Sequence, residues 1–107
     1  MERLWTTDAC TMPIAERPVR VAEFDDLFAT SVRRVESRGC EVRMYLSGGA
    51  GLAERVRDLT ERETACCSFF TFGVDGSDRD LVLDISVPPD RREILDALAE
   101  RARERLV

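Results

Sequence analysis

The stretch CEVRMYL, residues 40–46, alternates strictly between apolar and polar side chains. A period of two is typical of a β-strand with one face in the core and the other in solvent. The apolar positions share one face, so we expect Cys40 to point into the core. They are Cys40, Val42, Met44 and Leu46.

Helical periodicity flanks this strand on both sides. Before it, apolar residues recur at helical spacing and Gly39 provides a stop, which predicts an amphipathic helix over 19–37. After it, the glycine-rich loop 47–51 leads into apolar steps of three and four residues. These steps predict a second helix, with two adjacent cysteines at its C-terminal end. Its stripe is Leu52, Val56, Leu59, Glu63, Cys66 and Phe70.

The remaining third of the chain has the pattern of a hairpin and a helix. Residues 69–74 and 80–87 are typical of strands, with a turn at 75–78. Asp90 and Glu93 have the spacing of a capping box for a final helix. Its predicted buried stripe is Ile94, Leu95, Leu98, Ala102 and Leu106.

These elements predict a single α+β domain over residues 1–107. A chain of 107 residues is long enough for one compact domain and too short for two. Residues 1–18 contain two prolines and no periodic pattern, which predicts an irregular N-terminal arm that packs on the rest. The last five elements form a β-α-β-β-α unit. We therefore expect a ferredoxin-like arrangement of three strands covered by helices, preceded by the arm and the first helix.

Composition excludes several kinds of chemistry. All 16 basic residues are Arg, and the absence of Lys and His excludes Schiff-base lysines, histidine bases and imidazole ligands. The net charge of -5 has the wrong sign for collecting phosphates, so we expect no nucleic-acid partner. No stretch approaches the roughly 18 apolar residues of a membrane span, and the first residues lack the apolar run of a signal peptide. We expect a cytoplasmic protein with no membrane partner.

Four cysteines are the most distinctive residues for chemistry. Thiols stay reduced in the cytoplasm, so packing, metal binding or redox chemistry explains them better than a disulfide framework. A disulfide between the adjacent Cys66 and Cys67 would be strained, which predicts a vicinal pair of thiols. Cys10, in the adaptable arm, is the better candidate for a third sulfur. Cys40 fits the inward face of its strand as a core residue.

Glu63 is unusual because it places a carboxylate on the apolar stripe of a helix. It precedes Cys66 by three residues and Cys67 by four, within side-chain reach of either sulfur. It is a candidate to complete a metal shell, to accept a thiol proton, or to pair structurally with Arg62 or a more distant arginine. Of these three roles we favour the structural pair.

Two other segments are expected to be structural. The loop 47–51 lacks the Lys and Ser/Thr of a phosphate-binding loop, so we expect a tight turn. The aromatic residues Phe69, Phe70 and Phe72 are expected to pack in the core and not to form a stacking platform, given the acidic charge.

The segment from Glu63 to Phe69 resembles the E-x-x-C-C-x-F segment of small uncharacterised bacterial proteins of actinobacterial type. It is also similar to the Cys-Cys segment appended to some MerR-type heavy-metal-responsive regulators. The run from Cys10 to Pro13 resembles the arm of the stand-alone proteins. The resemblance implies a link to thiophilic metals and gives Glu63, Cys66, Cys67 and Cys10 as candidate functional positions. Unlike the regulators, this chain has no helix-turn-helix pattern or basic patch, so DNA binding has no support.

The leading hypothesis is a cytoplasmic soft-metal or metalloid binding protein with an accessory role. Cys66 and Cys67 would be thiolate ligands, Cys10 a third ligand and Glu63 an auxiliary one. Thiolates prefer Hg(II), As(III), Cd(II), Cu(I) and Zn(II), and we expect no organic cofactor.

Two alternatives stay open, and the sequence does not decide whether the protein is an enzyme. One is a thiol-based enzyme or redox protein acting on a small thiol-reactive ligand. In it, Cys66 and Cys67 act as nucleophile and resolving thiol, and Glu63 shuttles the proton. The other is a structural or interaction domain with packed cysteines, forming a homodimer through a sheet edge.

Overall fold

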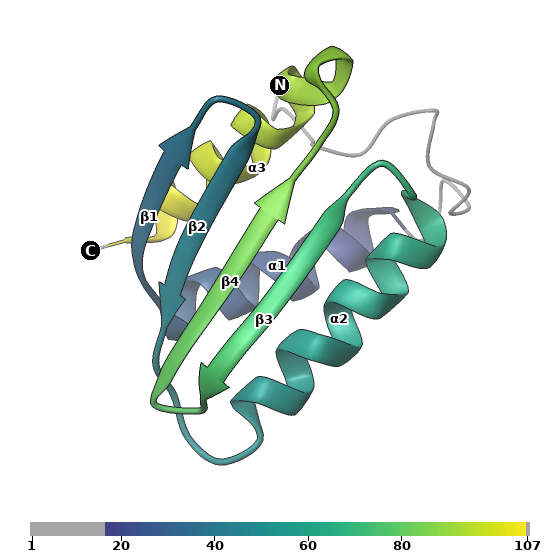
Figure 1. Cartoon of the computed structure of the whole chain (residues 1–107). Helices are drawn as coiled ribbons and strands as arrows, with labels where there is room; N and C mark the ends of the chain where they lie inside the picture. The colour runs from purple at the N-terminus through teal and green to yellow at the C-terminus, as the bar shows by residue number, and fades with distance from the viewer. Residues whose placement is uncertain (1–16, 107) are drawn as a thin grey trace.

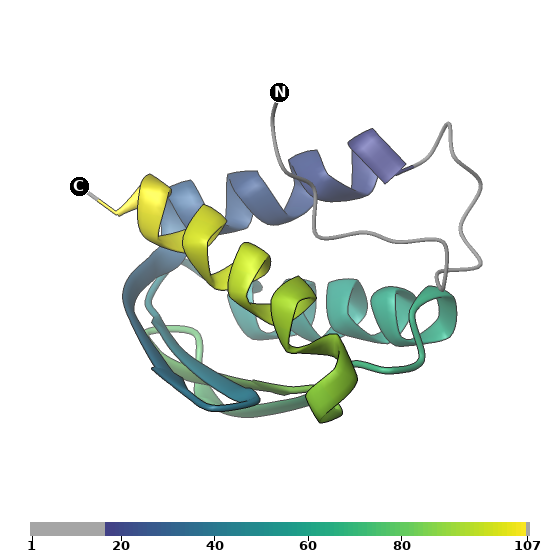
Figure 2. The same cartoon turned by 90° about the horizontal axis from the view of Figure 1, so that it is seen from above.

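An antiparallel four-stranded sheet, with three helices on one of its faces, makes up the fold (Figures 1 and 2). The computed structural model describes residues 17–106. In chain order the elements are α1 (Arg17–Ser31), β1 (Val32–Arg38), β2 (Glu41–Leu46), α2 (Leu52–Cys66), β3 (Thr71–Ser77), β4 (Asp80–Ser86), the 3-10 turn η2 (Pro89–Arg91) and α3 (Arg92–Arg105). The predicted α+β class is confirmed.

The sheet has the strand order β1-β2-β4-β3, and every neighbouring pair is antiparallel. β4 pairs with both β2 and β3, so it lies between the two strands that α2 connects (Figure 1). The end of α2 therefore leads into an edge strand, β3.

The predicted helix over 19–37 is wrong in its last third. The helix ends at Ser31, and residues 32–38 form β1, so the sheet has four strands and not the three expected. Val32 and Val35 fit helical spacing, but both are β-branched and also suit a strand. Gly39, with a φ of 57°, makes the tight turn that lets residues 32–38 pair with β2. Pairing with β2 outweighs the continuing helical pattern.

Alternating side chains of β2 and β4 form the floor of the core, as predicted. α1 adds three side chains with no exposed surface, Phe24, Leu27 and Phe28. The buried strand residues are Val42, Met44, Leu46, Leu81, Leu83 and Ile85. Cys40 departs from the expected alternation, because it belongs to the turn before β2 and is half-buried against the edge of the core.

The start of the last helix also differs from the prediction. Pro89–Arg91 forms a 3-10 turn, the residue that precedes α3 is Arg91, and no side chain caps the helix. The expected capping box of Asp90 and Glu93 is therefore wrong. The stripe is largely correct: Leu95, Leu98 and Ala102 are buried, and Ile94 and Leu106 pack partly against the core.

Two smaller differences concern the hairpin and the arm. β3 begins at Thr71 and the turn falls at 78–79, so the first strand is shifted by about two residues from the expected one. Of the predicted arm, residues 1–16 lie outside the described residues and 17–18 begin α1. Within 17–106, none of the helices combines the length and apolar character needed to cross a bilayer.

Candidate functional site

The candidate site lies at the C-terminal end of α2. The helix ends at Cys66, and Cys67 follows with a non-helical backbone (φ -126°, ψ 80°). The N–H of Cys67 donates to the carbonyl oxygen of Glu63 at 2.7 Å, and the N–H of Phe70 donates to that of Cys67 at 3.2 Å. These bonds turn the chain from the helix toward β3, and three of the four predicted site residues, Glu63, Cys66 and Cys67, lie within one turn.

The two cysteines are in different chemical states. Cys67 has no exposed surface and is disulfide-bonded, whereas Cys66 is half-buried and carries a thiol. The expected pair of vicinal thiols is thus one thiol and one disulfide sulfur. The two are not bonded to each other, in line with the strain argument. Cys40 is also a thiol, so the partner of Cys67 is not among the described residues; the candidate residue Cys10 lies outside them.

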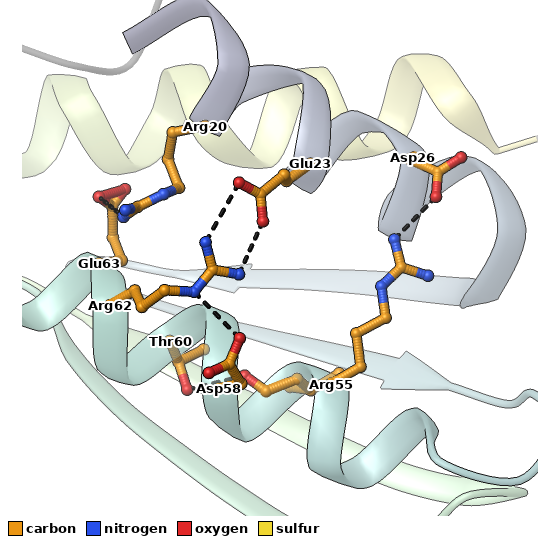
Figure 3. A network of polar contacts seen from close by, with 9 residues as sticks. Arg20, Glu23, Asp26, Arg55, Asp58, Thr60, Arg62 and Glu63 are labelled. Carbon is orange, nitrogen blue, oxygen red and sulfur yellow. Dashed lines mark hydrogen bonds and ion pairs between the residues drawn. The ribbon is translucent and has the colours of Figure 1, made fainter. Parts of the chain in front are cut away.

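Glu63 is completely buried and contacts the neighbouring helix α1. Its Oε1 accepts a hydrogen bond from Nη1 of Arg20 at 3.3 Å, and its Oε2 has no hydrogen-bond partner in the described part of the chain (Figure 3). Burial raises the pKa of Glu63 to about 7, and the charges of Arg20 and Arg62 only partly oppose this. The structural pair that we favoured forms, with the more distant arginine.

Arg62 is held by other carboxylates. Its guanidinium donates two hydrogen bonds to Glu23 of α1, at 2.7 and 3.1 Å, and one to Asp58 of its own helix at 3.0 Å (Figure 3). The bonds from Arg62 hold the pKa of Glu23 below its ordinary value. The guanidinium of Arg62 therefore donates to Glu23 and Asp58 and not to the carboxyl of Glu63.

Aromatic side chains follow the site in the chain and pack on one another. Phe70 is buried, with ring centroids 4.7 Å from Phe69 and 5.4 Å from Phe72. The guanidinium of Arg91 lies over the ring of Phe69, 5.3 Å from its centroid. The run packs in and against the core, as predicted, and Cys67 belongs to the same core cluster.

The opposite end of α2 is occupied by a side chain of the protein. The carboxylate of Asp78 accepts hydrogen bonds from the backbone N–H of Gly51 at 3.1 Å and of Ala53 at 2.8 Å. The N–H groups of the glycine loop thus serve the fold, which confirms the expected structural turn.

The part of the chain that the structure describes holds no formed metal site. Among residues 17–106, no group of three or more Cys, Asp or Glu side chains is arranged to hold a metal ion. A cavity of about 560 Å³ lies over the sheet, where its lining includes Arg43, Gly73 and Asp84 but no cysteine. Glu63, Cys66 and Cys67 do not line this cavity.

Sequence reasoning missed Arg20. Its partner is 43 residues away, so no local spacing connects the two. The one available signal is the i, i+3, i+6 series Arg20, Glu23 and Asp26, which places three charged side chains along one face of α1. Those three contact Glu63, Arg62 and Arg55 of α2 (Figure 3).

Comparison of the chain with known protein families, with curated proteins and with solved structures found no match.

Proposed function

We propose that the C-terminal end of α2 is a thiol–disulfide redox site. The sulfur of Cys67 is the redox-active atom, and Glu63 donates the proton. The partly exposed thiol of Cys66 is the group that a thiol-reactive ligand contacts first. One observation carries the proposal: a buried disulfide sulfur, a partly exposed thiol and a buried carboxyl with a pKa of about 7 share one turn.

The chemistry explains why a proton donor belongs here. A thiolate of an external dithiol attacks the sulfur bonded to Cys67, the S–S bond breaks, and Cys67 leaves with the electron pair as a thiolate. The second thiol of the reagent then displaces the protein sulfur, and the reagent leaves as a disulfide. A thiolate at a fully buried position is costly, so the leaving sulfur needs a proton.

Glu63 is suited to supply that proton. It is close to half protonated at neutral pH, and the hydrogen bond from the N–H of Cys67 to the carbonyl oxygen of Glu63 holds the two residues one turn apart. It then recovers a proton from solvent. If the protein is cytoplasmic, as we propose, a disulfide at Cys67 is more in keeping with a transient redox role than with a permanent cross-link.

The test is a redox titration of the full chain in glutathione buffers of defined ratio. The thiols are alkylated and counted by mass spectrometry of the peptide that contains Cys66 and Cys67. We expect a reversible transition at Cys67 that Cys67→Ser abolishes and Cys40→Ser, which removes another half-buried thiol, leaves intact. A Cys67 disulfide that native protein never exchanges would reject the redox function and leave a structural cross-link.

Soft-metal or metalloid binding is a second candidate, for the reduced protein. Its support is the end of α2 at Cys66, which releases the next sulfur from the 100° spacing of a regular helix. Native mass spectrometry of reduced protein with Hg(II), As(III), Cd(II), Cu(I) and Zn(II) tests it. One ion per chain, lost in Cys66→Ser and Cys67→Ser but not in Cys40→Ser, is the supporting result. Binding that follows only the number of cysteines opposes it.

We also propose that the fold is ferredoxin-like in its finer arrangement. Support comes from β2, α2 and β3, which form a β-α-β unit split by β4, followed by α3. β1 takes the remaining place in the sheet, beside β2.

A further inference from the structure

The two carboxyl oxygens of Glu63 differ in their contacts. Arg20 is largely buried, with 12% of its side chain exposed, and its Nη1 lies 3.3 Å from Oε1. Oε2 is buried and has no hydrogen-bond partner in the part of the chain that the structure describes. A neutral carboxyl whose one oxygen accepts from a guanidinium carries its proton on the other. The proton of neutral Glu63 therefore resides on Oε2.

The other charged groups around Glu63 are already satisfied. Glu23 of α1 and Arg62 of α2 face it, but they bond to each other through two hydrogen bonds, and Arg62 also binds Asp58. Among residues 17–106, Arg20 is thus the guanidinium that contacts the carboxyl of Glu63.

The backbone of α1 holds Arg20 in place. The next residue, Val21, is 4% exposed, and Phe24, one turn further on, has no exposed surface. Both pack in the central core, so the guanidinium extends from a fixed helix toward α2 (Figure 3). A donor held in this way costs little ordering when the carboxyl becomes charged.

We propose that Arg20 is a positioning residue for the reaction at Cys67: it fixes Oε1 of Glu63, makes Oε2 the atom that gives up the proton, and stabilises the carboxylate that remains. This inference rests on the proposed redox function. The covalent change is the dithiol exchange already described, and Arg20 neither gains nor loses a proton in it.

Removing Arg20 has two consequences. The carboxyl loses its anchor, so either oxygen can carry the proton and fewer encounters are productive. It also loses a nearby positive charge, so Glu63 holds its proton to higher pH. The contribution of Glu63 to the reaction should then be smaller and extend to more alkaline pH.

The experiment measures the rate at which dithiothreitol reduces the Cys67 disulfide in native full-length protein between pH 5.5 and 8.5. Each protein is compared with a matched Glu63→Gln version at the same pH, so that ionisation of the reagent cancels in the ratio. For the wild type, we expect the rate divided by that of Glu63→Gln to be about ten or more at low pH and to fall with a midpoint near pH 7. For Arg20→Gln we expect a smaller ratio and a midpoint about one pH unit higher, partly restored by Arg20→Lys.

Arg55→Gln is the matched control. It removes another arginine bridge between α1 and α2, from Arg55 to Asp26 at 2.7 Å, and leaves Glu63 untouched. We expect its profile to match the wild type. Because the midpoint is measured on folded protein, a modest loss of stability in Arg20→Gln does not imitate the effect.

The outcomes separate this inference from the function on which it rests. If Glu63→Gln slows reduction but Arg20→Gln keeps the wild-type midpoint and ratio, Arg20 has no positioning role and the redox function stands. If Glu63→Gln itself leaves the rate unchanged at every pH, the proton-donor role fails and the inference fails with it. If Arg20→Gln does not fold, Arg20→Lys provides the test alone. Its positive charge lies at a different place from the guanidinium, so the midpoint of the rate ratio should still move.

Discussion

The last hydrogen bond of helix α2 runs from the N–H of Cys67 to the carbonyl oxygen of Glu63, over 2.7 Å. The backbone thereby holds a disulfide-bonded residue and a buried acid in a fixed relation, one turn apart. Four predictions follow from this end of the helix and from the contacts that hold α1 and α2 in the fold.

Glu63 should make the protein less stable as the pH rises. The pKa of Glu63 lies near 7 in the folded chain and near 4.5 when unfolded, so the folded state binds its proton more tightly. Stability therefore falls between about pH 4.5 and 7. In Glu63→Gln this loss should be absent, a relative gain of up to about 3 kcal/mol at pH 8 compared with pH 4.5. Urea unfolding of oxidised protein at pH 4.5 and pH 8 measures this difference, with Glu61→Gln at an exposed position as control. An equal change in the free energy of unfolding between the two pH values in all three proteins would count against the raised pKa.

The disulfide at Cys67 should contribute to thermal stability. Cross-linking restricts the unfolded chain, and removal of a native disulfide costs about 2–4 kcal/mol. A phosphine reductant should therefore lower the Tm of wild-type protein and of Cys40→Ala. It should leave the Tm of Cys67→Ala unchanged. Calorimetry with and without reductant measures this, and a reductant effect that persists in Cys67→Ala would contradict the assignment.

Arg101 should be among the most sensitive positions of α3. It is 5% exposed and donates two hydrogen bonds to Asp25 of α1. Burial alone would raise the pKa of Asp25, but bonds and charge from Arg101 and Arg105 hold it below its ordinary value. Arg101→Met leaves a half-buried carboxylate short of its main partner and should cost about 3 kcal/mol in urea unfolding. Arg92→Met, which breaks an exposed pair with Asp96, should cost about 0.5 kcal/mol or less; similar losses at both positions would oppose this assignment.

Asp78 should stabilise the start of α2. Its carboxylate accepts from the N–H groups of Gly51 and Ala53, which have no partner within the helix. Asp78→Ala should therefore cost about 1–2 kcal/mol in chemical denaturation. Asp80→Ala, at an exposed position at the other side of the same turn, is the matched control. No difference between the two variants would show that water replaces the carboxylate.

The sequence predicts those parts of the fold that local pattern decides. The alternation in 40–46 and 80–87 gives two strands because one face of each is buried, and the steps from Leu52 to Cys66 give α2 for the same reason. The segment 32–38 escapes prediction because its two valines fit helical spacing, while the register shift between Val32 and Arg34 removes the alternation that would mark a strand. Its state depends on a tertiary partner, β2, reached through the turn at Gly39.

The candidate site divides in the same way. Glu63, Cys66 and Cys67 are neighbours by helical spacing, so their proximity is predictable. The contact of Glu63 with Arg20 depends on how α1 packs against α2, over 43 residues of sequence, and the disulfide of Cys67 on a partner beyond its own helix. The series Arg20, Glu23 and Asp26 marks a charged face of α1 but does not identify its partners, and the disulfide leaves no local pattern around Cys67.

The bond between Asp78 and the glycine loop matters for anyone who attaches a fluorophore, a tag or an inserted domain to this protein. Although the turn between β3 and β4 resembles an ordinary surface loop, it is tied to α2, and an insertion there would loosen the helix that carries the cysteines. The turn between β1 and β2 is bonded instead to the residue after β4, since the carbonyl oxygen of Cys40 accepts from the N–H of Val87 at 3.1 Å. A side chain added at Gly39 would meet no atom within 4 Å, although its φ of 57° favours glycine. Foreign sequence placed after Gly39, with the glycine kept, should leave both ends of α2 as they are.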